Sequence, residues 1–220
     1  MAGKVLKVPP APEYPPEEGH YLRGNDYSPV AVVVTLNTPY GSIPPEVEEL
    51  VRVSVETGAA LAGTVQTENI GIEKIVANIV ANPNIRYLVL CGREVEGHRP
   101  GDAIKGLIEN GIDGRRTIIN CSANTPYLFN IPLEAIQRFR QQVTLVNLLN
   151  MTDAEFLKRA VSSCYQERPK SFMSYSLWDP GAFPEPPIFC KITWRITRPY
   201  EVEDWEVEGV LKETWPEERL

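Results

Sequence analysis

The stretch VAVVVTL, Val30 to Leu36, is a continuous apolar run that is rich in β-branched residues. Such a run is typical of a strand buried on both faces, as in the parallel sheets of α/β proteins. A similar run follows at Ile85 to Leu90, and a weaker one lies between them at Ala59 to Gln66. These three segments predict the centre of a sheet that is covered on both sides.

Helical patterns separate the predicted strands. Residues 42–45 (SIPP) open a helix that we expect to reach about Thr57, because proline suits a first helical turn. A second helix is expected after a cap at Asn69, because apolar residues then recur every three or four positions until Asn82-Pro83-Asn84. The patterns predict further helices over Gly101–Asn110, Pro132–Leu149 and Asp153–Tyr165, and a further strand over Thr117–Ser122.

This alternation of strands and helices predicts an α/β fold with a doubly wound, mostly parallel sheet. Residues 1–27 carry five prolines and predict an extended N-terminal arm, because proline denies the backbone donors that regular elements use. We expect the α/β domain over residues 28–167 and a small β-rich C-terminal extension over residues 168–220. In that extension Ile188–Thr197 alternates like an antiparallel strand.

Composition excludes several classes of function. The 220 residues are 43% hydrophobic and 23% charged, as in ordinary globular proteins. The net charge of −7, without a basic stripe, argues against a nucleic-acid surface. No apolar run approaches the ~20 residues that span a bilayer, and the N-terminus does not resemble a signal peptide. The four cysteines form no CxxC pair, so we expect free thiols. Together with the lack of a spanning run and of a signal peptide, this predicts a soluble, cytoplasmic protein without a membrane anchor.

His98, one of two histidines, is the clearest candidate for chemistry. It follows the strand predicted at 85–90, and open α/β sheets bind ligands at the carboxyl ends of their strands. Imidazole serves as a metal ligand, an acid or base, or a pH switch. A single loop histidine is nevertheless more often inert, so the residues alone leave both interpretations open. Gly97, beside it, indicates a loop with close approach or unusual dihedral angles.

Asp102 lies four residues beyond His98 and has two interpretations. A carboxylate on the second ring nitrogen fixes the imidazole tautomer and raises its basicity as a ligand. Alternatively, Asp102 is a first-turn acid that complements the helix dipole, which the sequence alone favours.

Thr67, Glu68 and Asn69 follow the neighbouring predicted strand and open a helix. Their backbone donors would suit an anionic group of a ligand, or they form a simple capping turn. Phosphate-binding glycine motifs, a GxSxG elbow, HExxH and paired-histidine metal sites are all absent from the sequence, so hydrolase mechanisms have little support.

Several separate sequence motifs between about Val30 and Leu149 resemble those of the A subunit of tetrahydromethanopterin S-methyltransferase. They occur in the order expected for that family and are TENIGIEK at 67–74, NPNIR at 82–86, CGREVEGH at 91–98, ENG at 109–111, NIP at 130–132 and FRQQ at 139–142.

The resemblance implies a Rossmann-like fold that binds a corrinoid, cobalamin. The family's glycine-histidine pair falls on Gly97 and His98, so the resemblance implies that His98 is the lower axial ligand to cobalt. The expected function is a methyl carrier that accepts a methyl group on cobalt and passes it on. Its donor would be a methyl-pterin or another methylated compound, delivered by a partner methyltransferase similar to the H subunit of the same complex. We expect Asp102 to orient His98, Thr67, Glu68 and Asn69 to line the cobalamin site, and a homodimer to supply one wall.

Three segments depart from the family pattern. After the histidine the family usually has Ile-Thr-Gly-Gln, where this sequence has Arg99-Pro100-Gly101-Asp102. A glycine-rich segment before the NIP motif is replaced by Cys121–Tyr127, and Glu213–Glu218 stand where membrane-bound members carry an anchor. These departures keep two alternatives open. One is a non-catalytic interaction protein of the same fold that has lost the corrinoid, and the other is an unrelated enzyme that uses His98 as a general base.

Overall fold

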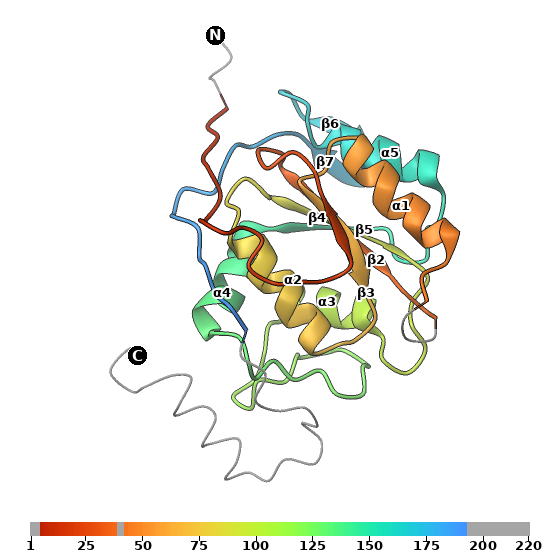
Figure 1. Cartoon of the computed structure of the whole chain (residues 1–220), viewed down its shortest axis with the longest axis vertical. Helices are drawn as coiled ribbons and strands as arrows, with labels where there is room; N and C mark the ends of the chain where they lie inside the picture. Colours follow the sequence, from red (N-terminus) through yellow and green to blue (C-terminus); the bar gives the residue numbers. More distant parts are fainter. Residues whose placement is uncertain (1–4, 39–41, 193–220) are drawn as a thin grey trace.

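The computed structural model describes residues 5–38 and 42–192. Their centre is a five-stranded sheet in the order β1-β3-β2-β4-β5 (Figure 1). The strands β2, β3, β4 and β5 are parallel, while β1 lies antiparallel to β3 at the edge. The prediction of an α/β fold with a doubly wound, mostly parallel sheet is therefore confirmed. The strands are β1 (Tyr21–Arg23), β2 (Val30–Thr35), β3 (Leu61–Val65), β4 (Tyr87–Gly92) and β5 (Thr144–Asn147).

Helices cover both faces of this sheet, which explains why β2 and β4 are apolar at nearly every position. Alternate residues of a strand point to opposite faces. Ala31 and Val33 of β2 accordingly join the core beneath α2, α3 and α4, whereas Val32 and Val34 join the core beneath α1 and α5. The helices are α1 (Pro45–Glu56), α2 (Ile70–Val80), α3 (Pro100–Glu109), α4 (Leu133–Gln142) and α5 (Ala154–Ser163). None of the helices in the described ranges has the length and apolar character needed to cross a membrane.

The direction of winding reverses between β2 and β4. From β2 the chain passes to β3 on one side, and from β3 it crosses to β4 on the other. The ends of β2 and β4 are held together by Thr35, whose hydroxyl donates to the carbonyl oxygens of Cys91 (3.1 Å) and Arg93 (2.7 Å). Gly92 has φ +87°, and a Cβ there would lie 2.8 Å from the Thr35 carbonyl oxygen. Such a reversal is where open α/β sheets bind ligands.

Two of the elements predicted between residues 117 and 149 were wrong. The helix expected over Pro132–Leu149 ends at Gln142. The chain turns into β5 because Val143, Thr144 and Val146 are β-branched and residues 144–147 pair with β4. The strand expected over Thr117–Ser122 is reduced to isolated bridges. Positive φ angles at Arg116 (64°) and Asn120 (55°) interrupt the extended backbone there.

The β-rich extension is represented by a two-stranded antiparallel hairpin, β6 (Lys170–Phe172) and β7 (Tyr175–Leu177). The strand expected over Ile188–Thr197 does not form at residues 188–192, where the Ile188 amide instead donates to the Val80 carbonyl oxygen. The rest of that segment, 193–197, lies outside the described residues. The division of the chain at residues 27 and 167 stays a prediction.

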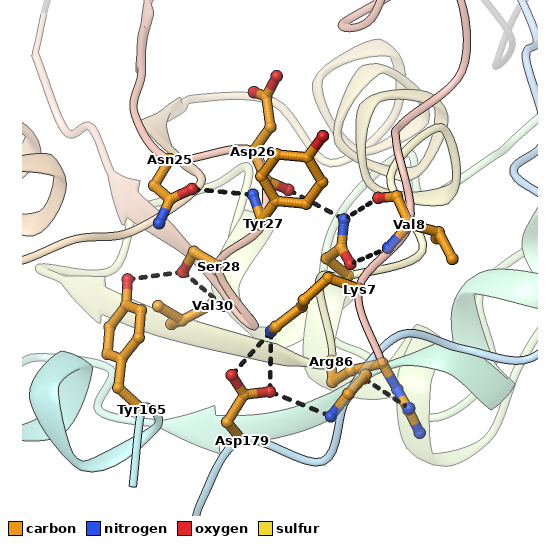
Figure 2. Close-up of polar contacts among 12 residues, drawn as sticks. Lys7, Val8, Asn25, Asp26, Tyr27, Ser28, Val30, Arg86, Tyr165 and Asp179 are labelled. Carbon is orange, nitrogen blue, oxygen red and sulfur yellow. Dashed lines mark hydrogen bonds and ion pairs between the residues drawn. The ribbon is translucent and has the colours of Figure 1, made fainter. Parts of the chain in front are cut away.

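The N-terminal arm packs along the domain and includes β1. Asn84 binds the backbone of Val8 from both sides, accepting from its amide (3.2 Å) and donating to its carbonyl oxygen (2.6 Å). Asn78 does the same with Glu17, at 2.9 and 3.1 Å. Lys7 forms an ion pair of 2.7 Å with Asp179 (Figure 2) and thus joins the arm to the C-terminal segment.

Gln142 offers a test of how the end of α4 supports the fold. Its buried side-chain amide donates to the carbonyl oxygens of Ile79 (3.1 Å), Asn82 (2.9 Å) and Ile85 (3.0 Å). Gln142→Leu should lower the free energy of unfolding by roughly 2 to 3 kcal/mol, because buried carbonyl groups lose their donor. Urea unfolding measures this, with the exposed neighbour Gln141→Leu as control. Equal stability of the two variants would contradict this account.

Candidate functional site

His98 and Glu68 meet beside the point where the winding reverses. The loop after β4 carries His98, and the loop after β3 carries Glu68; the imidazole Nδ1 lies 2.8 Å from the Glu68 Oε2. The Glu68 side chain is 0% exposed, whereas the His98 side chain is 55% exposed. The other ring nitrogen, Nε2, has no hydrogen-bond partner among residues 5–38 and 42–192. One side of the imidazole is thus anchored in the protein and the other is available.

Glu68 is itself fixed by a third segment. Its Oε1 accepts from both the amide (2.9 Å) and the hydroxyl (2.8 Å) of Thr125. Thr125 belongs to residues 110–132, which we call the α3–α4 connection. A carboxylate held in this way favours the imidazole tautomer with its proton on Nδ1, and it raises the basicity of Nε2 as a ligand. Carboxylates support metal-bound histidines of other proteins in the same way.

The loop that carries His98 is closed by Glu94. The Glu94 carboxylate accepts from the amides of Val95 (2.9 Å), Gly101 (3.1 Å) and Asp102 (2.7 Å). It therefore caps the N-terminus of α3, where a negative charge is stabilised by the helix dipole. The loop has a positive φ of 82° at Gly97, as its glycine suggested. Among residues 5–38 and 42–192, a Cβ at Gly97 would have only the Asn124 side-chain nitrogen within 4 Å, at 3.9 Å, so these residues leave the space beside this backbone open.

Asp102 does not contact His98 directly. Its Oδ2 accepts from the amide (2.8 Å) and the hydroxyl (2.6 Å) of Ser122. The family resemblance led us to expect the Asp102 carboxylate on a ring nitrogen of His98, but the carboxylate found there is that of Glu68. The reason is that Asp102 lies in the first turn of α3 beside the α3–α4 connection, while the loop after β3 reaches the imidazole. Burial acts to raise the pKa of Asp102, but the Ser122 hydrogen bonds and the charges of Arg99 and Lys105 outweigh it and hold that pKa below its ordinary value.

Thr67 and Asn69 act as capping residues of α2. The Thr67 hydroxyl accepts from the Gly71 amide (3.1 Å), and the Asn69 side chain accepts from the Ile70 amide (2.8 Å). This is the capping turn that was one of the two interpretations of this segment. Glu68 between them is turned into the protein, and of the three residues it alone forms a hydrogen bond with His98.

Behind the site, a second buried carboxylate holds the α3–α4 connection. Glu73 of α2 accepts from the Asn130 amide (2.7 Å) and side chain (3.1 Å). Arg116 folds the same connection by donating to the carbonyl oxygens of Leu128 (2.6 Å) and Ile131. Burial raises the pKa of Glu73 to about 7, although the Asn130 hydrogen bonds and the Arg116 charge oppose this.

Sequence reasoning missed three residues of this arrangement, Glu94, Ser122 and Thr125. Ser122 and Thr125 lie in Cys121–Tyr127, which the sequence marks only as a departure from the family pattern. Glu94 caps a helix from outside the usual capping positions, so no spacing rule indicates it. The order of the strands was the signal available for Glu68, because β3 and β4 flank β2 and their loops end at the same edge.

The fold and this site define an α/β domain with an oriented histidine at the reversal of its sheet. Residues 7–193 match the family model MtrA, which describes the A subunit of tetrahydromethanopterin S-methyltransferase. The chain belongs to this family.

Curated relatives from methanogens agree with this assignment, and all three named here are A subunits of tetrahydromethanopterin S-methyltransferase. The one numbered 1 in Methanothermobacter marburgensis is 41% identical over 211 residues, which cover 96% of this chain and 78% of that protein. The one numbered 2 in Methanothermobacter thermautotrophicus is 39% identical, with 86% of this chain and 91% of the relative covered. That of Methanocaldococcus jannaschii is 37% identical, with 96% and 77% covered.

Glu73 predicts a pH dependence of stability. Its pKa in the folded protein, about 7, exceeds the ordinary value of 4.5, so the folded state holds a proton that the unfolded state releases between these values. The protonated Glu73 side chain therefore adds to the free energy of unfolding at low pH, and this contribution is lost as pH rises through about 7. Between pH 5 and 8 the wild-type free energy of unfolding should fall by roughly 2 kcal/mol more than that of Glu73→Gln. Denaturant titrations at several pH values measure this difference, and parallel curves for the two proteins would contradict it.

Proposed function

We propose that this chain is a corrinoid-binding methyl carrier in which His98 is the lower axial ligand to cobalt of cobalamin. The observation that carries the proposal is the His98–Glu68 contact, which anchors Nδ1 and leaves Nε2 without a partner in the described part of the chain. Family membership supports the same assignment.

The residues present fit a cobalt corrinoid. Imidazole is a suitable ligand for cobalt, and a carboxylate on the other ring nitrogen is the usual support of a metal-bound histidine. The His98 ring is more than half exposed, and the described part of the chain leaves open space beside the backbone at Gly97. A flat macrocycle can therefore approach the ligand without displacing a side chain that packs on Gly97.

When bound, the corrinoid would supply the cobalt that takes up and releases the methyl group. The protein would control how strongly the imidazole binds. Glu68 stabilises a proton on Nδ1 and so keeps the Nε2 lone pair available. Thr125 holds Glu68 in place through two hydrogen bonds, which limits how far the imidazole can move.

The methyl donor in this proposal is a methyl-pterin or a related methylated compound. It would reach the corrinoid through a separate pterin-dependent methyltransferase similar to the H subunit of the family's complex. The relatives support this, because they are named as subunits of tetrahydromethanopterin S-methyltransferase. The two other interpretations, a corrinoid-free interaction protein and an enzyme with His98 as general base, are outcomes of the experiment below.

The test is reconstitution with aquacobalamin, followed by gel filtration and reduction to the cobalt(II) form. Wild type should retain the corrinoid, and electron paramagnetic resonance should show splitting from a protein nitrogen that changes from a triplet to a doublet when histidine carries ¹⁵N. His98→Ala should lose that splitting. Glu68→Gln should keep it while cobalamin affinity falls roughly 10- to 100-fold, as is usual for the loss of a residue that orients a metal-bound histidine.

The other histidine provides the matched control. His20 is exposed and lies outside the loops that form the site, so His20→Ala should behave as wild type. If wild type retains no cobalamin, the carrier function fails and the interaction protein is favoured. If His98→Ala shows the same ¹⁵N-sensitive splitting as wild type, His98 is not the ligand. Turnover of a substrate by corrinoid-free protein would favour the general-base enzyme.

A further inference from the structure

Asp102 does not touch His98, yet it belongs to the hydrogen bonds that fix the imidazole. The Asp102 backbone is set by Glu94, whose Oε2 accepts from the Asp102 amide at 2.7 Å. The same Glu94 carboxylate binds the amide of Val95 at 2.9 Å, so one side chain links the two ends of the loop that carries His98. The position of the Asp102 side chain is therefore coupled to that loop.

The Asp102 side chain reaches across to the α3–α4 connection. One carboxylate oxygen, Oδ2, accepts both donors of Ser122, at 2.8 Å from the amide and 2.6 Å from the hydroxyl. Two hydrogen bonds from one residue to an ionised carboxylate are strong and define its orientation. This contact fixes the backbone of Ser122 relative to the first turn of α3.

Ser122 stands three residues before Thr125, and Thr125 binds Glu68. The amide and hydroxyl of Thr125 both donate to the Glu68 Oε1, at 2.9 and 2.8 Å. Residues 122–125 are thus held at one end by the Asp102 carboxylate and at the other by the Glu68 carboxylate. The other oxygen of Glu68 contacts the His98 Nδ1 at 2.8 Å.

We propose that Asp102 is a positioning residue for His98 that acts through Ser122, Thr125 and Glu68. Its hydrogen bonds hold residues 122–125 where Thr125 can bind Glu68, and Glu68 then holds the imidazole. The consequence for cobalt ligation rests on the proposed function. The consequence for the imidazole does not, because the hydrogen bonds lie within the chain itself.

The competing explanation is that Asp102 only complements the dipole of α3. The structure weakens this explanation, because Glu94 already accepts from the Gly101 and Asp102 amides at the start of that helix. A first-turn acid would also affect stability alone and would leave the imidazole tautomer unchanged. The tautomer therefore separates the two roles.

The experiment records ¹⁵N nuclear magnetic resonance of the His98 side chain in the full-length, corrinoid-free protein. In the neutral imidazole of wild type, Nδ1 should be protonated and Nε2 unprotonated. Asp102→Ala should move both nitrogen shifts toward those of a free imidazole, which exchanges between tautomers. Asp102→Asn should restore the wild-type shifts, because its side-chain oxygen can still accept from Ser122.

Asp113→Ala is the matched control. Asp113 also lies in the α3–α4 connection and accepts from the amides of Arg115 (2.9 Å) and Thr117 (2.8 Å), but it has no contact with Ser122 or Glu68 in the described chain. Its removal should leave the His98 shifts unchanged. Ser122→Ala, which removes only the hydroxyl donor, should produce a smaller shift than Asp102→Ala in the same direction. The double variant should resemble Asp102→Ala alone, since the two residues act in series.

The outcomes keep this inference separate from the proposed function. If Asp102→Ala folds and its His98 ¹⁵N chemical shifts equal those of wild type, the positioning role of Asp102 is wrong. If that variant does not fold, unchanged His98 chemical shifts in Ser122→Ala contradict the role instead. Altered shifts in a protein that does not retain aquacobalamin support the positioning role and reject the carrier function. If aquacobalamin is retained by wild type, Asp102→Ala should also weaken that retention roughly tenfold.

Discussion

A carboxylate buried without water must be given hydrogen-bond partners, and the site of this protein is built on that constraint. Glu68 has no exposed surface, and both of its oxygens are used. One oxygen binds Thr125 of the α3–α4 connection, and the other binds His98 of the loop after β4. Three segments that are remote in sequence are thereby joined through one side chain. More than half of the His98 side chain is exposed, so packing alone does not fix the ring. The hydrogen bond to Glu68 gives the imidazole its orientation.

The sheet makes this junction possible. Since β3 and β4 lie on either side of β2, their following loops leave the same edge of the sheet near the end of β2. Thr35 and Gly92 keep the ends of β2 and β4 in close contact, so the loop of His98 starts from a fixed point. The N-terminal arm adds support away from this edge, because asparagine side chains of α2 and of the turn after it hold its backbone. The core elements thus provide a rigid support for loops that carry the functional groups.

Local patterns predicted much of the fold, since they depend on neighbours in sequence. The apolar run at Val30–Leu36, the proline start of α1 and the Asn69 cap each indicated the element that the structure contains. The end of α4 was missed because Val143 and Val146 continue a helical spacing by coincidence while their β-branched side chains favour β5. His98 was found because it follows a buried strand. Glu68 was expected to line the same site, but its hydrogen bond to His98 was not predicted, because a contact across 30 residues leaves no periodic signal.

The two departures from the family pattern around the site have a common structural explanation. Asp102 ends the altered segment Arg99-Pro100-Gly101-Asp102, and Ser122 lies in the altered segment Cys121–Tyr127. In the structure they bind each other at 2.6 and 2.8 Å. Ser122 donates both its amide and its hydroxyl to the Asp102 carboxylate. The two segments are therefore complementary in this structure: the Asp102 carboxylate on α3 meets donors on the connection that carries Thr125, and the contact between Glu68 and His98 lies beside them.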